Sequence, residues 1–158
     1  HIPAGIREKL LCRKPIEIRH VNPVDPFEPA KKEPVKYVWF KAIDTMPDDP
    51  AAQQYMLAYA SDFNLVATTL YPHGYTFWQP EMQVASLDHA MWYHREVRMD
   101  EWLLYAMDSP TASGARGFAR GQFFTQDGTM VASTTQEGLV RVVDPAKARK
   151  RSDPSKQQ

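Results

Sequence analysis

The stretch Ser86-Leu-Asp-His-Ala-Met-Trp-Tyr-His-Arg95 places a hydroxyl, a carboxylate, two imidazoles and a guanidinium beside a tryptophan within ten residues. Side chains of a regular strand alternate between its two faces. Such alternation predicts that Ser86 and Asp88 share one face and that His89 and Met91 share the other. Both faces then carry polar groups, so the stretch predicts either the wall of a functional site or a strand with many hydrogen bonds.

The sequence that follows this stretch predicts an antiparallel sheet. Strand-like patterns cover Trp102–Met107, Ala115–Thr125 and Met130–Val143. Between the last two, Gln126-Asp-Gly-Thr129 predicts a hairpin turn, because Asp-Gly readily adopts the positive φ angles that a tight turn requires. The C-terminal half is therefore expected to consist mostly of strands.

The sequence that precedes the stretch predicts two strands and a helix. Alternating or β-favouring residues predict strands at Ile16–His20 and Val35–Ile43. Asp49 before Pro50 predicts a helix start, because a capping carboxylate and a first-turn proline are typical of helix N-termini. We expect this helix over Ala51–Leu70, and we expect it to be buried on several sides, because apolar residues cover much of its circumference.

The order of these elements predicts an α+β fold in which one antiparallel sheet wraps around a long central helix. No Gly-rich phosphate loop follows a strand, which argues against P-loop and Rossmann folds. The formal net charge is zero, which argues against a dedicated nucleic-acid-binding protein. No apolar run approaches the roughly 18–20 residues of a membrane span, and the single cysteine, Cys12, cannot form an internal disulfide.

Asp62 is the first candidate for a catalytic group. It falls on one helical stripe with Tyr55, Tyr59 and Val66, and a carboxylate within an apolar stripe needs polar partners. The alternative is that Ser61-Asp62 marks a kink or a restart, with Asp62 capping a second helical segment.

Gln136 and Ser86 are weaker candidates when each is taken alone. Gln136 is predicted to share an apolar strand face with Ala132 and Thr134, where an amide ordinarily hydrogen-bonds to a neighbouring group. An isolated serine on a strand, such as Ser86, carries almost no information about function.

His89 and His94 suggest metal binding or acid–base chemistry, but their spacing opposes both interpretations. Five residues apart on a regular strand, they point to opposite faces, and a zinc site typically needs three or four protein ligands. A Ser/His/Asp triad is also disfavoured, because Ser86 and Asp88 are predicted to face away from His89 and the sequence has no Gly-x-Ser-x-Gly motif. We expect no metal site and two structural histidines.

Arg116 and Arg120 are predicted to share one strand face, opposite a face that carries only small residues. Small side chains let a ligand or another backbone approach closely, and arginines on such a strand could bind phosphate groups. The alternative is that the two arginines form surface salt bridges.

Taken together, several segments resemble the C-terminal half of the acyl-CoA thioesterase II (TesB-like) family. The resemblance runs in order from about Tyr37 to Arg141. Its most specific parts are the Asp-His-x-x-Trp-x-His-Arg pattern and the Gln-Asp-Gly…Gln-Glu-Gly hairpin. The segments that carry it, besides the opening stretch, are Asp100-Glu-Trp-Leu-Leu-Tyr105, Ser113-Gly-Ala-Arg-Gly-Phe118, Gln126-Asp-Gly-Thr-Met-Val-Ala-Ser133 and Gln136-Glu-Gly138.

This resemblance implies the second of two tandem hot-dog domains, and hydrolysis of fatty acyl-CoA to free fatty acid and CoA without a cofactor. Carried over by position, the family's catalytic set falls on Asp62, Ser86 and Gln136. Within that assignment His89 and His94 become supporting groups. Candidates for contacts with the CoA phosphates are Arg95, Arg116 and Arg120.

Two other functions remain open. A hot-dog module without catalysis could bind acyl-CoA or assemble with a catalytic partner. A hot-dog hydratase or dehydratase usually pairs an aspartate with a histidine, and the region of Asp62 contains no histidine.

The chain is expected to comprise an irregular linker with the first strand (1–34), a hot-dog thioesterase domain (35–143) and a flexible polar tail (144–158). Because a single hot-dog leaves a sheet edge or face that a partner normally covers, we expect pairing with an N-terminal hot-dog half or with another copy. The chain ends in Ser-Lys-Gln-Gln and not in the peroxisomal Ser-Lys-Leu signal, so a cytoplasmic location is expected.

Overall fold

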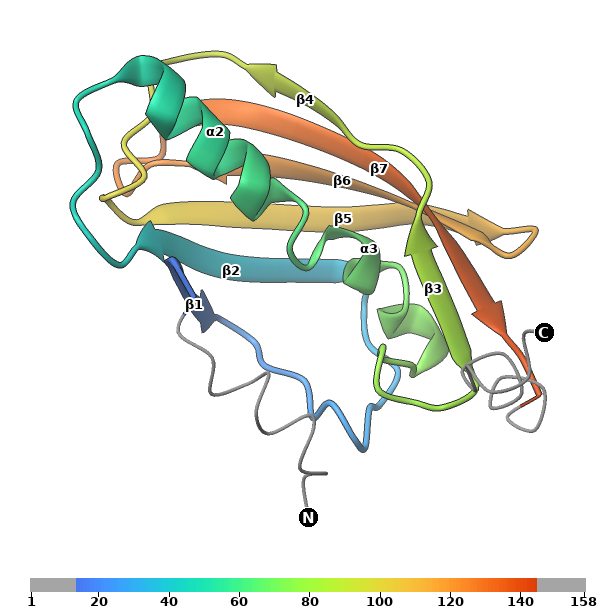
Figure 1. Cartoon of the computed structure of the whole chain (residues 1–158). Coiled ribbons are helices and arrows are strands. Elements are labelled where there is room, and N and C mark those ends of the chain that lie inside the picture. Colours follow the sequence, from blue (N-terminus) through green and yellow to red (C-terminus); the bar gives the residue numbers. More distant parts are fainter. Residues whose placement is uncertain (1–13, 145–158) are drawn as a thin grey trace, which may run out of the picture.

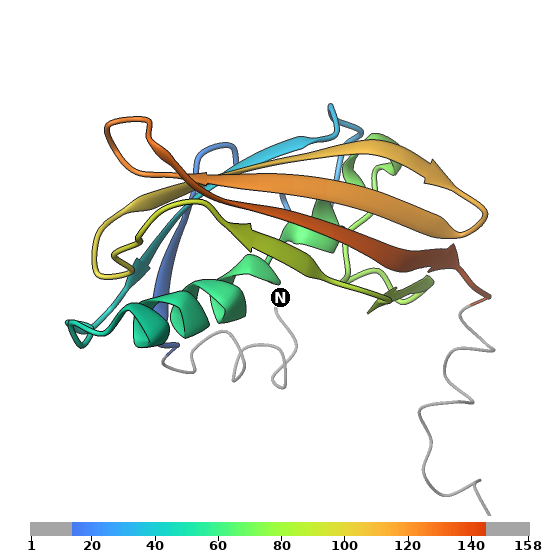
Figure 2. The same ribbon diagram turned by 90° about the horizontal axis from the view of Figure 1, so that it is seen from above.

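A curved, seven-stranded antiparallel sheet forms the body of the computed structural model, which describes residues 14–144 (Figure 1). The strand order is β1-β2-β5-β6-β7-β3, and β4 also pairs with β7. Within residues 14–144 the helices all lie on the same face of the sheet, as the view from above shows (Figure 2). The elements are β1 Ile16–His20, β2 Val35–Ala42, α2 Pro50–Ser61, α3 Leu65–Thr68, η1 Tyr71–His73, β3 Met82–Ser86, β4 Ala90–Tyr93, β5 Leu103–Ser113, β6 Arg116–Phe124 and β7 Met130–Val142.

The predicted α+β architecture and all predicted strands are confirmed, with changes at their ends. The expected division into linker, domain and tail stays a prediction, and its parts at 1–13 and 145–158 lie outside the described residues. Within 14–34, β1 pairs with β2 and so extends the same sheet. No helix within residues 14–144 is long and apolar enough to cross a membrane.

Strand β5 is longer than predicted, because the chain accommodates Pro110 without ending the strand. The pairing of β5 with β6 shifts by one residue between Asp108 and Thr111, which is a bulge that a proline can occupy. The strand then turns tightly through Gly114 and Ala115, whose φ angles are +57° and +61°. This hairpin was not predicted from the sequence, because alanine rarely adopts a positive φ.

The predicted Asp-Gly hairpin turn between β6 and β7 is present, but Asp127 does not adopt the positive φ angle that the prediction assigned to the Asp-Gly pair. Of its residues only Gly128 has a positive φ, +86°. Backbone hydrogen bonds from Thr125 N–H to the Thr129 carbonyl (3.0 Å) and from Gly128 N–H to the Thr125 carbonyl (3.0 Å) close the loop.

The opening stretch is one edge strand interrupted by a bulge. Ser86 pairs with Gly138 and Ala90 with Thr135, so three residues on this strand oppose two on β7. Directly paired residues share a face, so Ser86 and Met91 both lie on the helix-covered face, with Gly138 and Thr134. The prediction of strict alternation through the stretch is therefore wrong, because the bulge reverses the facing after Ser86.

The predicted single helix is two helices with a turn between them. Helix α2 ends at Ser61, and Asn64 then adopts a left-handed conformation with φ +72° before α3 begins. Such a φ cannot continue a right-handed helix. The predicted break at Ser61-Asp62 is confirmed, but Asn64 and not Asp62 is the N-cap residue of α3.

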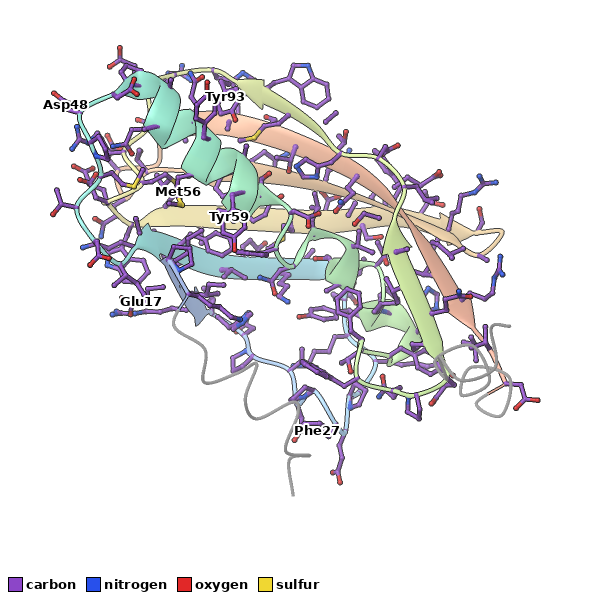
Figure 3. All side chains as sticks on the ribbon, viewed as in Figure 1. Glu17, Phe27, Asp48, Met56, Tyr59 and Tyr93 are labelled. Atoms are coloured by element: carbon purple, nitrogen blue, oxygen red, sulfur yellow. The ribbon has the colours of Figure 1, made fainter. Side chains whose placement is uncertain are left out.

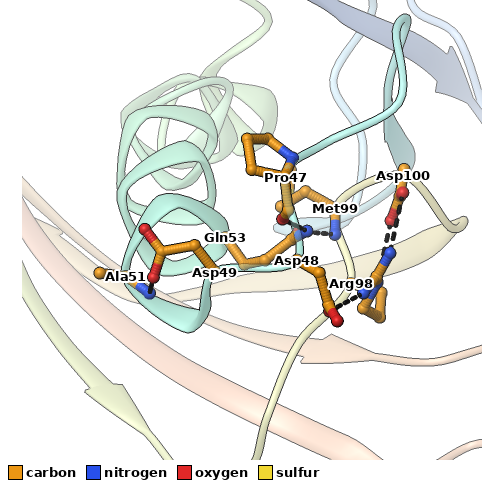
Figure 4. Close-up of polar contacts among 8 residues, drawn as sticks. All are labelled: Pro47, Asp48, Asp49, Ala51, Gln53, Arg98, Met99 and Asp100. Carbon is orange, nitrogen blue, oxygen red and sulfur yellow. Dashed lines mark hydrogen bonds and ion pairs between the residues drawn. The ribbon is translucent and has the colours of Figure 1, made fainter.

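The start of α2 is fixed as predicted (Figure 4). The Asp49 carboxylate accepts a hydrogen bond from the Ala51 N–H at 3.0 Å. Buried Gln53 ties the helix to two loops, donating to the Pro47 carbonyl (3.0 Å) and accepting from the Met99 N–H (2.7 Å). These bonds hold α2 at its first turn against the chain that follows β4.

Helix α2 buries only one side, contrary to the expectation of burial on several sides. Leu57 and Ala60 are fully buried against the sheet, whereas Tyr55 and Tyr59 are 73% and 51% exposed. Figure 3 shows Tyr93 beside helix α2. The Tyr93 hydroxyl from β4 donates to the Gln54 carbonyl at 2.9 Å. The sequence pattern selected the wrong stripe because tyrosines are amphipathic and occur on either side of a surface helix.

Candidate active site

Asp62 and Gln136 meet across the fold although 74 residues separate them in sequence. Gln136 lies in the middle of β7 with its side chain fully buried, and its Nε2 donates to Asp62 Oδ1 at 2.7 Å. Asp62 follows the last residue of α2, is exposed to solvent and caps the helix C-terminus. The amide therefore fixes the direction of a carboxylate whose second oxygen can meet a ligand.

The other end of the Gln136 amide is unsatisfied. Its Oε1 is buried without a hydrogen-bond partner among residues 14–144. Buried polar atoms without a partner are rare, and each calls for an explanation. The Gln136 amide thus uses its Nε2 donor to bond Asp62, while its Oε1 acceptor is left without a hydrogen bond.

Ser86 lies on the same face of the sheet as Gln136. It is the last residue of β3, is exposed, and pairs with Gly138, two residues beyond Gln136 on β7. Within the described part of the chain its hydroxyl makes no hydrogen bond. The structure thus brings Asp62 and Gln136 into contact and presents Ser86 on the adjoining strand.

Ser61, directly before Asp62, is held on three sides. Its hydroxyl donates to the Ala58 carbonyl at 2.7 Å and lies 2.7 Å from His89 Nε2. Because that hydroxyl has one proton, the His89 bond requires the proton on Nε2. The Ser61 carbonyl accepts from the Tyr105 hydroxyl at 3.0 Å, and Tyr105 in turn lies 2.7 Å from Thr134 Oγ1. Burial raises the pKa of Tyr105, so its hydroxyl stays protonated as a donor.

His89 faces the helices and His94 faces away from them, as predicted. His94 Nε2 lies 2.8 Å from the hydroxyl of Ser133, which is on the opposite face of β7 from Gln136. Because of the bulge, Ser86 and His89 face the same side, which corrects the prediction that they face apart. No group of His, Cys, Asp or Glu that could hold a metal ion occurs within residues 14–144.

Asp88 has a structural role in the bulge. Its carboxylate accepts a hydrogen bond from the Glu137 N–H at 2.7 Å, while the Glu137 carbonyl accepts from the Leu87 N–H at 2.9 Å. The carboxylate replaces a backbone acceptor that the bulge removes from the ladder. Asp88 therefore maintains the irregular edge opposite Gln136.

The three arginines suggested for CoA contacts lie apart from one another. Arg120 forms a surface ion pair with Asp108 at 2.5 Å, on the sheet face that carries no helices, which is the alternative that the sequence left open. Arg95 Nη1 donates to the Met130 carbonyl at 2.7 Å. Arg116 is exposed at the β5–β6 hairpin. A role in binding CoA stays a prediction for all three. Arg120 is the weakest of the three candidates, because its guanidinium is already paired with Asp108.

Lys36 is a buried charged residue that was not predicted from the sequence as a candidate for a functional site. It faces the helices from β2 and is only 8% exposed, with its Nζ donating to Asn64 Oδ1 at 2.7 Å. The sequence does indicate this facing, because Lys36 is spaced by steps of two from Val38 and Phe40, which are both fully buried.

The family model for acyl-CoA thioesterases matches residues 7–139 of this chain. The chain belongs to the acyl-CoA thioesterase family. It is 42% identical over 140 residues to acyl-CoA thioesterase 2 of Haemophilus influenzae, covering 89% of this chain and 49% of that protein. Human acyl-coenzyme A thioesterase 8 is 38% identical over 130 residues, covering 81% of this chain and 40% of that protein.

Solved structures agree on the fold. An acyl-CoA thioesterase II from Mycobacterium marinum superposes with a TM-score of 0.70 at 42% identity, over 81% of this chain and 49% of that one. A hot-dog protein of unknown function from Alicyclobacillus acidocaldarius gives 0.62 at 16% identity, over 82% and 47%. The fold is thus a hot-dog half, and the chain spans about half the length of the first relatives it matches or less.

Proposed function

We propose that this chain contributes a catalytic site for hydrolysis of fatty acyl-CoA thioesters to free fatty acid and CoA. The observation that carries the proposal is the 2.7 Å hydrogen bond from Gln136 Nε2 to Asp62 Oδ1, with Ser86 on the neighbouring strand and on the same face of the sheet as Gln136. A carboxylate, an amide and a hydroxyl on one face of the sheet can hold and activate a water molecule. Membership of the acyl-CoA thioesterase family supports the substrate class.

In the proposed reaction, Asp62 accepts a proton from water as the water oxygen attacks the thioester carbonyl carbon. Collapse of the tetrahedral intermediate then breaks the carbon–sulfur bond, and the CoA thiolate leaves and takes up the proton from Asp62. Gln136 orients the carboxylate, and Ser86 hydrogen-bonds the water or the carbonyl oxygen. General-base assistance is typically worth about 10²–10⁴-fold, and fixing the water adds to it.

We further propose that this half works beside a second hot-dog domain. The relatives are about twice as long, and in this chain one edge of the sheet is the interrupted strand β3–β4 with exposed Leu87 and Trp92. Such an edge ordinarily pairs with another strand or is covered. An N-terminal hot-dog half or another copy of this chain fits that role. The expected cytoplasmic location remains a prediction.

A spectrophotometric thiol-release assay with acyl-CoA substrates of several chain lengths tests the activity, with this chain alone and with an added N-terminal half. We expect CoA release in at least one of the two preparations. Binding of acyl-CoA without release in both preparations would support the alternative of a non-catalytic module.

A further inference from the structure

A cavity of about 280 Å³ lies between the loop after β1, helix α3 and the segment around η1. Aromatic rings of Tyr71, Tyr75, Phe77 and Trp78 form much of its wall. Lys36 and His20 also line it, and none of the described lining residues carries a carboxylate. The cavity combines an apolar wall with a positive charge.

The Lys36 ammonium has no counter-ion among residues 14–144. Its hydrogen-bond acceptor is the neutral amide oxygen of Asn64 at 2.7 Å, and the ring of Tyr71 lies 5.3 Å from its Nζ. His20, from the neighbouring strand, has the same sign of charge when it is protonated. Burial lowers the pKa of Lys36 to about 8, which reflects the cost of holding this charge out of water.

An anion in the cavity would relieve that cost, because buried charges are ordinarily paired. The other features select the kind of anion. A lone ammonium acts as a single point charge, without the forked donors with which arginine holds phosphate. The aromatic wall favours an apolar body, and the volume lies just below the roughly 300–1,000 Å³ of typical ligand pockets, so the ligand is small.

We propose that this cavity binds a small apolar monocarboxylate, with its carboxylate on Lys36 and its apolar body against Tyr71, Phe77 and Trp78. The site is separate from the pair Asp62 and Gln136, neither of which lines the cavity. The proposal does not depend on thioester hydrolysis, because a free acid and not a thioester is the ligand.

Calorimetric titration of the full 158-residue chain with octanoate tests the proposal. Two matched ligands accompany it: 1-octanol, which keeps the chain and lacks the charge, and inorganic phosphate, which keeps a charge and lacks the chain. We expect octanoate to bind at least about tenfold more tightly than either, as a charge-assisted hydrogen bond implies. Equal binding of octanol, or tighter binding of phosphate, would overturn the proposal.

Two substitutions on β2 locate the site. Lys36→Met removes the buried charge and keeps most of the side chain's length, and we expect octanoate affinity to fall at least about tenfold. Lys41→Met removes a charge from the other face of the same strand and should leave the affinity unchanged. Equal affinities of both variants and the unmodified chain would contradict the proposal.

Two further measurements guard against indirect effects of Lys36→Met. Ala67→Leu narrows the cavity from α3 while keeping the ammonium, and it too should weaken octanoate binding. Raising the pH from 7 to 9.5 should weaken binding at least about fivefold as the ammonium fraction falls, and Lys36→Met should lack this dependence. The other titratable lining groups are His20, Tyr71 and Tyr75, which the variant retains. An unchanged affinity in Ala67→Leu, or the same pH dependence in Lys36→Met, would refute the site.

Discussion

Single side chains decide how the Asp62 carboxylate is held. Two groups act on it: the Gln136 amide directly, and the His89–Ser61 hydrogen bond through the last turn of α2. The second hydrogen bond requires a proton on His89 Nε2, so in the neutral ring the Nδ1 atom carries none. We infer that His89 positions the turn and does not transfer a proton in hydrolysis.

Replacing His89 tests this role. His89→Ala should lower the free energy of unfolding by about 1 kcal/mol and slow hydrolysis by about tenfold or more, since small displacements of catalytic groups are costly. His89→Gln can still donate from its amide to Ser61 and should recover most of both losses. Activity as low in His89→Gln as in His89→Ala would argue for proton transfer. His94→Ala, which breaks a similar bond to Ser133 on the opposite face, should leave the rate unchanged.

Lys36 should make stability depend on pH in a defined direction. Its pKa is about 8 in the folded chain and 10.5 as the ordinary value, so the unfolded state binds more protons between these pH values. The folded state therefore gains stability from this group as pH rises from about 8 to 10.5. Lys36→Met removes the buried charge, so it should exceed the unmodified chain in stability at pH 7 by up to about 3 kcal/mol, with the gap closing toward pH 10.5. Denaturant unfolding across this range measures the difference.

Among the elements, the seating of α3 on the sheet is tight because two glycines face it. A Cβ at Gly138 would lie 2.6 Å from Val66 Cγ1, and one at Gly117 would lie 2.6 Å from Thr69 Cβ. Helix α3 packs against β6 and β7 at these glycines, where the two strands have no side chains. Strand β7 is also the neighbour of the strand that carries Ser86. The position of α3 thereby sets the turn that carries Asp62.

A larger residue at this contact should displace α3. We expect Gly138→Ala to lower the free energy of unfolding by about 1–3 kcal/mol through overpacking. Adding Val66→Ala makes room for the new methyl group and should return part of that loss. Additive losses in the double variant, measured by denaturant unfolding, would indicate that the two residues do not press on each other.

How far the sequence predicts these elements depends on whether local pattern or tertiary contact controls them. Asp49 before Pro50 correctly predicts the start of α2, because capping is a local interaction. The bulge between Ser86 and Ala90 was not predicted, because it depends on pairing with β7 and on Asp88 bonding to the Glu137 backbone. Local patterns indicate Asp62 and Gln136 only weakly and separately as candidate catalytic residues, and the family resemblance places them in one catalytic set. Their hydrogen bond is visible only in the fold.

At the scale of the whole molecule, the described residues leave one face of the sheet without helices and one edge with exposed apolar side chains. Leu87 and Trp92 on that edge are 54% and 51% exposed. We expect light scattering to give a mass above the 18.1 kDa of one chain, or association with an added N-terminal half. Trp92→Glu should weaken that association by placing a charge at the edge. If the chain stays monomeric and also does not bind the added N-terminal half, the proposed pairing is contradicted.

The central claim is that Asp62 activates water for thioester hydrolysis. The most direct measurement is CoA release from a long-chain acyl-CoA by Asp62→Asn, with Asp108→Asn as a matched loss of a carboxylate on the far face of the sheet. The measurement uses whichever preparation, alone or paired, is active. Asp62→Asn should fold normally and lose about 10²-fold or more of the rate, while Asp108→Asn retains it. Full activity in Asp62→Asn would contradict the proposed mechanism.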